Sequence, residues 1–203
     1  MSGRAGLPPT CPGLKIGLYG GTFNPPHEGH LLVARTALRA VHLHRLWWMV
    51  SPGNPLKTLA PPPVEERIAR SRALARDPHI VVTDVEADMG TRFTVDSLRF
   101  LRRLCPRVRF VYVMGADSFA TLHRWKNWRD IMRLTPIVVV DRPGQGIAAA
   151  RSVAARTFPR ARVPARSAAL LPRLAAPRWV LLYGRRSALS STDLRRKLAT
   201  GPG

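Results

Sequence analysis

The sequence predicts an α/β fold in which one parallel sheet carries helices on both faces. Short apolar runs alternate along the chain with segments whose apolar side chains recur at spacings of three and four residues. Strict alternation of strand and helix implies right-handed crossovers and therefore a doubly wound parallel sheet. The chain has 203 residues, of which 45% are hydrophobic and 7% aromatic, a composition typical of a folded protein and a length typical of one domain.

Six short apolar runs are the predicted strands: Leu14–Tyr19, Leu46–Ser51, Ile80–Val85, Val108–Met114, Ile137–Asp141 and Trp179–Gly184. Three segments have helical periodicity with arginines on the opposite face: His30–Ala40, Val64–Arg76 and Thr94–Leu104. Two stretches are less regular. Ser51–Pro63 is rich in proline and is expected to form a mobile loop, and Gly144–Pro177 is expected to hold one helix around Ile147–Arg156. Ligands of doubly wound sheets bind at the carboxyl ends of strands, so we expect the functional residues in the loops that follow them.

The charge balance is strongly basic: 33 lysines and arginines stand against 12 aspartates and glutamates, which gives a formal net charge of +21. A summed positive field attracts anionic partners, either nucleic acid or phosphorylated small molecules. The arginines are spread from Arg4 to Arg196 instead of forming one block, and alanine and proline are abundant with them. We therefore attribute most of the charge to compositional drift, and a basic nucleic-acid-binding protein is the less favoured alternative.

Neither cysteine indicates a zinc site or a disulfide framework, because Cys11 and Cys105 lie far apart and neither belongs to a C-x-x-C pair. The first 13 residues lack the apolar core of a signal peptide. No run approaches the roughly 18 apolar residues of a membrane span. We expect a cytoplasmic protein without a membrane segment.

The stretch GGTFNPPHEGH, residues 20–30, follows the first predicted strand. Gly20 and Gly21 are expected where a side chain would obstruct a ligand or the required backbone angles. The two prolines after Asn24 make the turn rigid, and a helix is expected to begin near His27. The unpaired N–H groups and the positive dipole end of such a helix start form a ready anion site.

His27 and His30 are three residues apart and should share one face of that first turn, while Glu28 points elsewhere, to solvent or into a cap. With Gly29 giving clearance, two imidazoles can hold a polyphosphate and donate hydrogen bonds to oxygens that gain charge around phosphorus. A zinc site would need further ligands, and HEGH is not the H-E-x-x-H of a metalloprotease. A purely structural pair of capping histidines is less favoured, because Gly-Gly, Pro-Pro and His-x-Gly-His coincide at the end of a strand.

This stretch and LSSTDLR, residues 189–195, together resemble the nucleotidyltransferase superfamily, and within it the bacterial nicotinate mononucleotide adenylyltransferases. The first family motif, G-G-[ST]-F-[ND]-P-P-H-x-G-H, is matched at every position. The last, I-S-S-T-x-I-R, is matched with Leu189 and Leu194 as conservative replacements. SPGNPLK, TRFTVDSL and MGADSFATLHRWKNW are similar to internal stretches of the family, so the resemblance extends over residues 14–198.

The resemblance implies a Rossmann-like doubly wound sheet of the nucleotidyltransferase type, in one domain over residues 14–199 with a small C-terminal helical part. Residues 1–13 and 200–203 are then expected to be flexible termini. It also implies an enzyme that moves AMP from ATP to nicotinate mononucleotide, giving deamido-NAD and pyrophosphate in NAD biosynthesis. A sister enzyme acting on nicotinamide mononucleotide or another phosphorylated substrate is the alternative. Mg2+ is expected to arrive bound to ATP, with no metal site on the protein, and assembly into a homo-oligomer is compatible with the sequence.

Carried over residue by residue, the resemblance assigns catalysis to His27, His30, Lys57 and Arg195. The implied ATP-binding residues are Gly20, Gly21, Thr22, Phe23, Gly29, Gly115, Asp117, Ser190, Ser191 and Thr192. The implied mononucleotide-binding residues are Asn24, Thr94, Asp96, Trp125 and Arg142. An indole face such as that of Trp125 suits an electron-poor pyridine ring. The residues themselves also allow plainer roles, helix caps for Thr94 and Asp96 and core packing for Trp125 and Trp128.

Overall fold

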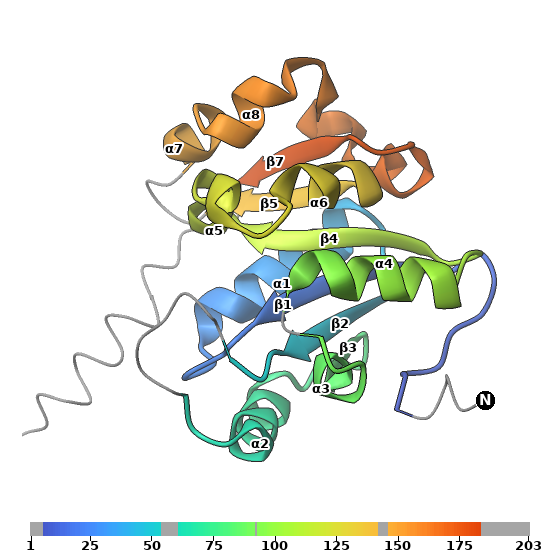
Figure 1. Ribbon diagram of the computed structural model, residues 1–203, viewed down its shortest axis with the longest axis vertical. Helices are drawn as coiled ribbons and strands as arrows, with labels where there is room; N and C mark the ends of the chain where they lie inside the picture. The colour runs from blue at the N-terminus through green and yellow to red at the C-terminus, as the bar shows by residue number, and fades with distance from the viewer. Residues whose placement is uncertain (1–5, 54–60, 92, 142–145, 184–203) are drawn as a thin grey trace, which may run out of the picture.

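The protein was analysed as a computed structural model that describes residues 6–53, 61–91, 93–141 and 146–183 (Figure 1). Its centre is a seven-stranded sheet in the order β3-β2-β1-β4-β5-β7-β6, and all neighbouring strands are parallel. The strands are β1 (Lys15–Gly21), β2 (Arg45–Val50), β3 (Ile80–Thr83), β4 (Arg109–Gly115), β5 (Ile137–Asp141), β6 (Arg162–Val163) and β7 (Trp179–Tyr183). The doubly wound parallel sheet predicted from the sequence is confirmed.

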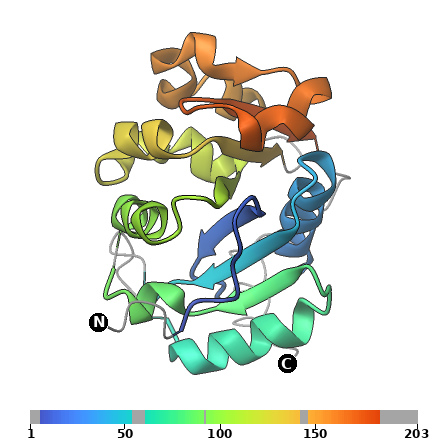
Figure 2. The ribbon, with the colours of Figure 1, turned by 90° about the vertical axis from the view of Figure 1, so that its right-hand side faces the viewer.

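Helices cover both faces of this sheet, as the view along its edge shows (Figure 2). One face carries α1 (Glu28–Ala40), α2 (Val64–Leu74) and the 3-10 helix η3 (Ala165–Arg173). The other face carries α3 (Val85–Asp88), α4 (Thr94–Leu104), α5 (Ala116–Ala120), η1 (Leu122–Arg124), α6 (Trp128–Leu134), α7 (Gly146–Ala150), α8 (Val153–Thr157) and η2 (Pro159–Ala161). None of the described helices combines the length and apolar character needed to cross a membrane.

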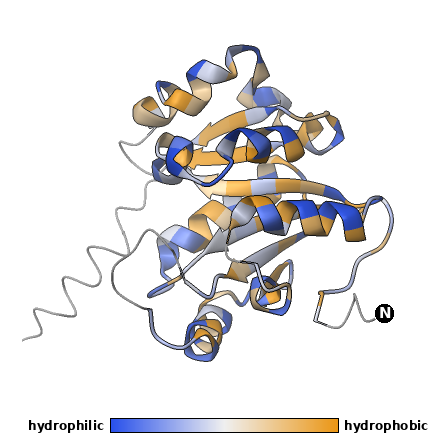
Figure 3. Cartoon of the chain, in the orientation of Figure 1, coloured by the Kyte–Doolittle hydropathy of each residue, from blue (hydrophilic) through white to orange (hydrophobic). Residues whose placement is uncertain are grey.

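The core has two apolar layers, one on each face of the sheet. Along β4, Tyr112 and Met114 point into the layer beneath α4, whereas Val111 and Val113 point into the layer beneath α1. A parallel sheet buried on both faces needs apolar residues at nearly every strand position, which is why its strands appear in the sequence as unbroken apolar runs. Figure 3 shows the same arrangement, with apolar strands between helices whose outer surfaces are polar.

The structure corrects the sequence prediction at three places. Val85 begins helix α3 and does not end a strand. The two-residue strand β6 was not predicted, and it lies at the edge of the sheet beside β7. The single helix expected around Ile147–Arg156 is two short helices, α7 and α8, because the chain turns at Ser152, whose hydroxyl caps α8 by accepting the N–H of Ala155.

Part of the segment expected to be a flexible terminus packs on the domain. Leu7 lies against the core layer beneath α4. The N–H of Gly13 donates to the carbonyl of Arg107 at 2.8 Å, and the Thr10 hydroxyl lies 3.9 Å from the Cys105 sulfur. Thr10 and Gly13 of this segment therefore contact the chain just after α4. The C-terminal helical part expected from the resemblance lies outside the described residues.

Candidate active site

The carboxyl ends of β1 and β4 lie side by side, since the two strands pair directly. Gly20 and Gly21 end β1, and Gly115 ends β4. Neither Gly20 nor Gly21 has the left-handed backbone that favours glycine. A Cβ at Gly20 would instead lie 3.1 Å from the Tyr112 hydroxyl oxygen, and one at Gly21 would lie 3.1 Å from the Phe23 ring. Any larger residue at these positions would therefore force the Tyr112 or the Phe23 side chain to shift by a few tenths of an ångström.

His27 and His30 cap the start of α1 reciprocally. Nδ1 of His27 accepts the N–H of Gly29 at 3.0 Å, and Nδ1 of His30 accepts the N–H of His27 at 3.2 Å. This is a capping box built from two imidazoles. It satisfies two of the backbone N–H groups that have no partner within the helix at its start. The ring centroids are 3.8 Å apart. The helix start predicted near His27 and the shared face of the two rings are confirmed.

These caps fix which ring nitrogen of each histidine is a donor. An imidazole nitrogen that accepts a hydrogen bond carries no proton, so the neutral rings hold their proton on Nε2. Both histidines therefore carry an Nε2–H group, and their rings lie together at one helix start, an arrangement of donors suited to phosphate oxygens. Glu28, between them, is exposed.

Phe23 supports His30 from the core side. Its ring centroid lies 5.0 Å from that of His30 in an edge-to-face arrangement and 4.6 Å from that of Trp48. Aromatic contacts of this kind hold the rings in defined orientations. Phe23 is itself buried and has a left-handed backbone with φ of 45°. Its side chain thus acts behind the histidine, and an ATP contact would have to come from its backbone.

Tyr112 joins the two halves of the predicted site. Its hydroxyl lies against Gly20 at the end of β1 and is hydrogen-bonded to the side chain of Thr94, the first residue of α4. Burial and the nearby Glu86 carboxylate raise the pKa of Tyr112, so it stays a neutral phenol. A residue predicted to bind ATP and one predicted to bind the mononucleotide thus lie at the same hydroxyl. The N-cap of α4 is Phe93, which places Thr94 one position inside the helix, so the capping role considered for it is wrong.

Two other predicted mononucleotide residues, Asp96 and Trp125, come from segments that are tied together. Asp96 forms an ion pair with Lys126, the neighbour of Trp125, at 3.4 Å. The Lys126 ammonium also lies 4.2 Å from the centre of the Phe93 ring. Trp125 is half-buried after η1, whereas Trp128 is a core residue with its ring edge-to-face against Phe158. The structure therefore separates the two tryptophans: Trp128 belongs to the core and Trp125 lies at its border.

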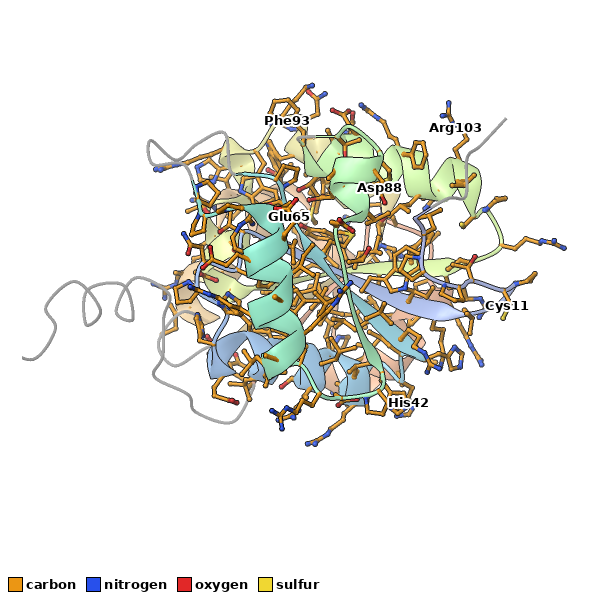
Figure 4. All side chains as sticks on the ribbon, turned by 90° about the horizontal axis from the view of Figure 1, so that it is seen from below. Cys11, His42, Glu65, Asp88, Phe93 and Arg103 are labelled. Carbon is orange, nitrogen blue, oxygen red and sulfur yellow. The ribbon has the colours of Figure 1, made fainter. Side chains whose placement is uncertain are left out.

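A buried polar network that the sequence analysis missed lies behind this helix start. The Ser97 hydroxyl donates to Oε1 of Glu86 at 2.9 Å and lies 2.9 Å from the Thr91 hydroxyl. The N–H of Thr91 donates to the carbonyl of Glu86 at 3.0 Å. Burial raises the pKa of Glu86, while the Ser97 hydrogen bond opposes the rise. Figure 4 labels Asp88, the last residue of α3, and Phe93, the residue before α4, between which Thr91 lies in the sequence.

The remaining predicted residues have these places. Asp117 is exposed in α5, just after Gly115, and Asn24 is half-buried in the turn before α1. Six predicted residues lie outside the described part of the chain: Lys57, Arg142, Ser190, Ser191, Thr192 and Arg195. In the part that is described, no three His, Cys, Asp or Glu side chains form a group that could hold a metal ion.

Comparison with known proteins identifies the family. The chain matches the cytidylyltransferase-like family over residues 18–197. It is 51% identical, over 91% of its length, to the whole of a Methylorubrum extorquens protein named "Probable nicotinate-nucleotide adenylyltransferase". A protein of the same name from Ruegeria pomeroyi is 48% identical over 95% of this chain and 90% of its own.

Solved structures show the same fold. The structure described as Plasmodium falciparum nicotinic acid mononucleotide adenylyltransferase complexed with NaAD superimposes with a TM-score of 0.66. It covers 90% of this chain and 83% of its own at 16% identity, which supports the fold alone. Since the sequence matches span nearly the whole chain and include the turn that carries both histidines, the chain belongs to the cytidylyltransferase-like family and, within it, to the nicotinate-nucleotide adenylyltransferases.

Proposed function

We propose that this chain transfers AMP from ATP to nicotinate mononucleotide, forming deamido-NAD and pyrophosphate. The observation that carries the proposal is the reciprocal capping of His27 and His30, which brings two imidazole rings, each with an Nε2–H donor, to one helix start after β1. That arrangement suits a polyphosphate and the charge that develops on it. The family to which the chain belongs supports the same activity.

The reaction is a single in-line displacement. An oxygen of the mononucleotide phosphate attacks the α-phosphorus of ATP, the bond from that phosphorus to the bridging oxygen of the β-phosphate breaks, and pyrophosphate leaves. A phosphate nucleophile is already ionised at neutral pH, so no general base is needed. Catalysis then consists of positioning the two substrates and stabilising the charge that develops on the phosphate oxygens.

The ATP side uses the first motif together with residues outside the described part. Gly20–Thr22, Gly29 and Gly115 bring backbone close to the nucleotide, and His27 and His30 donate to phosphate oxygens. Lys57 and Arg195 hold the β- and γ-phosphates, and Ser190–Thr192 hold the same group through hydroxyls and N–H groups. Asp117 contacts the nucleotide and not a metal ion.

The mononucleotide side uses the start of α4 and the segment after η1. The pyridine ring lies on the Trp125 indole, and its carboxylate accepts N–H groups of the first turn of α4, where Thr94 lies. The proposal draws support from the Asp96–Lys126 ion pair, which ties these two segments to each other. Asn24 and Arg142 are the other two residues that bind the mononucleotide in this proposal.

Magnesium enters as part of the ATP substrate. The described residues offer no carboxylate cage, and an ion already bound by phosphates needs few protein ligands. When bound, Mg2+ offsets phosphate charge, and every residue role given above is independent of where it sits. Residence in the cytoplasm and assembly with further copies of this chain stay predictions.

The test is to incubate the protein with ATP, Mg2+ and either nicotinate or nicotinamide mononucleotide, and to measure pyrophosphate. With ATP and nicotinate mononucleotide, we expect pyrophosphate to form, and to form faster than with ATP and nicotinamide mononucleotide. A higher rate with the amide would assign the chain to the sister activity. No pyrophosphate with either mononucleotide, from protein shown to be folded by circular dichroism, would overturn the proposal.

A further inference from the structure

Arg67, in the first turn of α2, is buried beneath the loops that follow β1 and β2. It is 2% exposed, although helical periodicity placed the arginines of this segment on the solvent side. Its Nη1 donates to the carbonyls of Thr22 at 2.8 Å and of Ser51 at 2.7 Å. Glu65, labelled in Figure 4, marks the same helical turn.

The other two nitrogens of the guanidinium also donate to backbone carbonyls. Nη2 donates to the carbonyl of Pro52 at 3.2 Å, and Nε donates to the carbonyl of Pro62 at 2.9 Å. All four acceptors are backbone carbonyls, and they come from three different stretches of chain. Only the rigid, forked guanidinium can reach so many acceptors at once, so lysine is not an equivalent here.

The charge of Arg67 has no carboxylate partner within salt-bridge distance among the described residues. Burial lowers the pKa of Arg67, and the nearby Glu65 carboxylate raises it again. Arginine nevertheless stays protonated in proteins. A buried cation that lacks a paired anion costs free energy, and the four hydrogen bonds to carbonyl oxygens offset that cost.

The four carbonyls show what the residue holds together. Thr22 lies in the motif between the end of β1 and the two histidines, and Ser51 and Pro52 follow β2. Pro62 lies just before α2. Arg67 therefore fastens both ends of the stretch between Pro52 and Pro62 to the motif. A direct bond from the N–H of Ser51 to the carbonyl of Gly21, at 2.9 Å, reinforces this junction.

We propose that Arg67 is a positioning residue for ATP, which sets the first motif and the loop after β2 in the relative positions that the triphosphate requires. This inference rests on the proposed function. Arg67 itself contacts neither substrate, and its effect passes through the Thr22 backbone. Its unpaired positive charge, beside the loops assigned to the triphosphate, favours the binding of the more highly charged of the two substrates.

The first experiment measures KM for each substrate in Arg67→Lys and Arg67→Met. Misplacement of binding groups by about 1 Å costs up to about 100-fold, so we expect KM for ATP to rise about 10- to 100-fold while KM for the mononucleotide changes less than about threefold. Arg70→Met is the matched control, because Arg70 is an exposed residue of the same helix that pairs with Glu66. Unchanged KM values in both Arg67 variants, or an equal rise for both substrates, would overturn the proposal. Arg67→Lys keeps the test valid should Arg67→Met fail to fold.

The second experiment needs no catalysis and so separates this inference from the proposed function. Endoproteinase Lys-C cuts only after lysine, and the chain has four: Lys15, Lys57, Lys126 and Lys197. Lys57 lies in the stretch whose ends Arg67 holds, so we expect Arg67→Met to speed cleavage there about tenfold, with cleavage at Lys126 and the Arg70→Met control unchanged. Equal acceleration at Lys57 and Lys126 would mean general destabilisation and would overturn the positioning role, as would no acceleration at all. Arg67→Lys is omitted because it adds a cleavage site.

Discussion

The backbone N–H of His27 donates to Nδ1 of His30, at a distance of 3.2 Å, so one nitrogen of the imidazole closes the helix start and the proton of the neutral ring lies on the other. The capping role of His30 therefore belongs to Nδ1, and the proposed role in catalysis belongs to Nε2. Substitutions can separate the two.

Replacing His30 with alanine should remove both roles. We expect turnover to fall by roughly two to three orders of magnitude through loss of an electrostatic donor, and the free energy of unfolding to fall by about 1 kcal/mol through loss of the cap. Glutamate, whose carboxylate can still accept the His27 N–H but has no proton to donate, should lose the turnover but keep the stability. Pyrophosphate assays and urea denaturation measure the two effects, with the exposed His79→Ala as control. Near-normal transfer by folded His30→Ala would contradict the assignment.

Trp125 should affect one substrate only. Loss of an indole platform costs about 1–2 kcal/mol at most, so Trp125→Ala should raise KM for nicotinate mononucleotide roughly tenfold and leave KM for ATP unchanged. Trp125→Phe should give a KM for nicotinate mononucleotide between that of the wild type and that of Trp125→Ala. The matched residue is Trp128, a core side chain whose replacement by alanine should lower stability by about 3–5 kcal/mol. If Trp125→Ala shifted both KM values alike, the pyridine platform would have to lie elsewhere.

Gly20 and Tyr112 should be energetically coupled. A Cβ at Gly20 would meet the Tyr112 hydroxyl at 3.1 Å but the ring carbon beneath it only at 4.0 Å. Gly20→Ala should therefore destabilise the protein by about 1–3 kcal/mol, whereas the same change in a Tyr112→Phe background should cost much less. Thermal or urea unfolding of the four proteins gives the coupling free energy. Additive effects would show that the hydroxyl does not set the need for glycine.

Glu86 should make stability depend on pH. Its pKa in the folded protein is raised above the ordinary 4.5 because it is buried. The folded state thus holds a proton that the unfolded state releases, so the contribution of Glu86 is fully present below about pH 4.5 and is lost as pH rises through the raised value. Glu86→Gln cannot ionise, and its stability relative to the wild type should increase with pH over that interval. Urea denaturation of both proteins from pH 4.5 to pH 8 measures this, and a constant difference between them would contradict it.

The strands and the main helices were predictable because their periodicity is strong. Helix α4 has the predicted limits, and β5 does as well. The two residues of β6 are too few to show a pattern, and the position of β6 depends on its pairing with β7. Val85 could end a strand or begin a helix, because an apolar residue is typical of both positions. The sequence pattern alone therefore could not assign it to α3.

The site was predictable where a motif crowds several unusual residues together, as between Gly20 and His30. It was not predictable where a polar group is embedded in apolar sequence. Tyr112 lies in an apolar strand and looks like any core aromatic residue, and only the fold brings its hydroxyl to Thr94. Arg67 was hidden for the opposite reason: in a chain with so many arginines, one buried guanidinium has no distinguishing sequence signal.

The two outer strands of the sheet bear on how the protein behaves at high concentration. An exposed strand edge is a template on which other chains can pair and aggregate. Among the described strands, the edges are β3, with four residues, and β6, with two, of which Arg162 is exposed and charged. Such short edges offer few backbone groups to an incoming chain. Their brevity gives the native state a built-in barrier to fibril-like stacking, and lengthening β6 by substitution would lower that barrier.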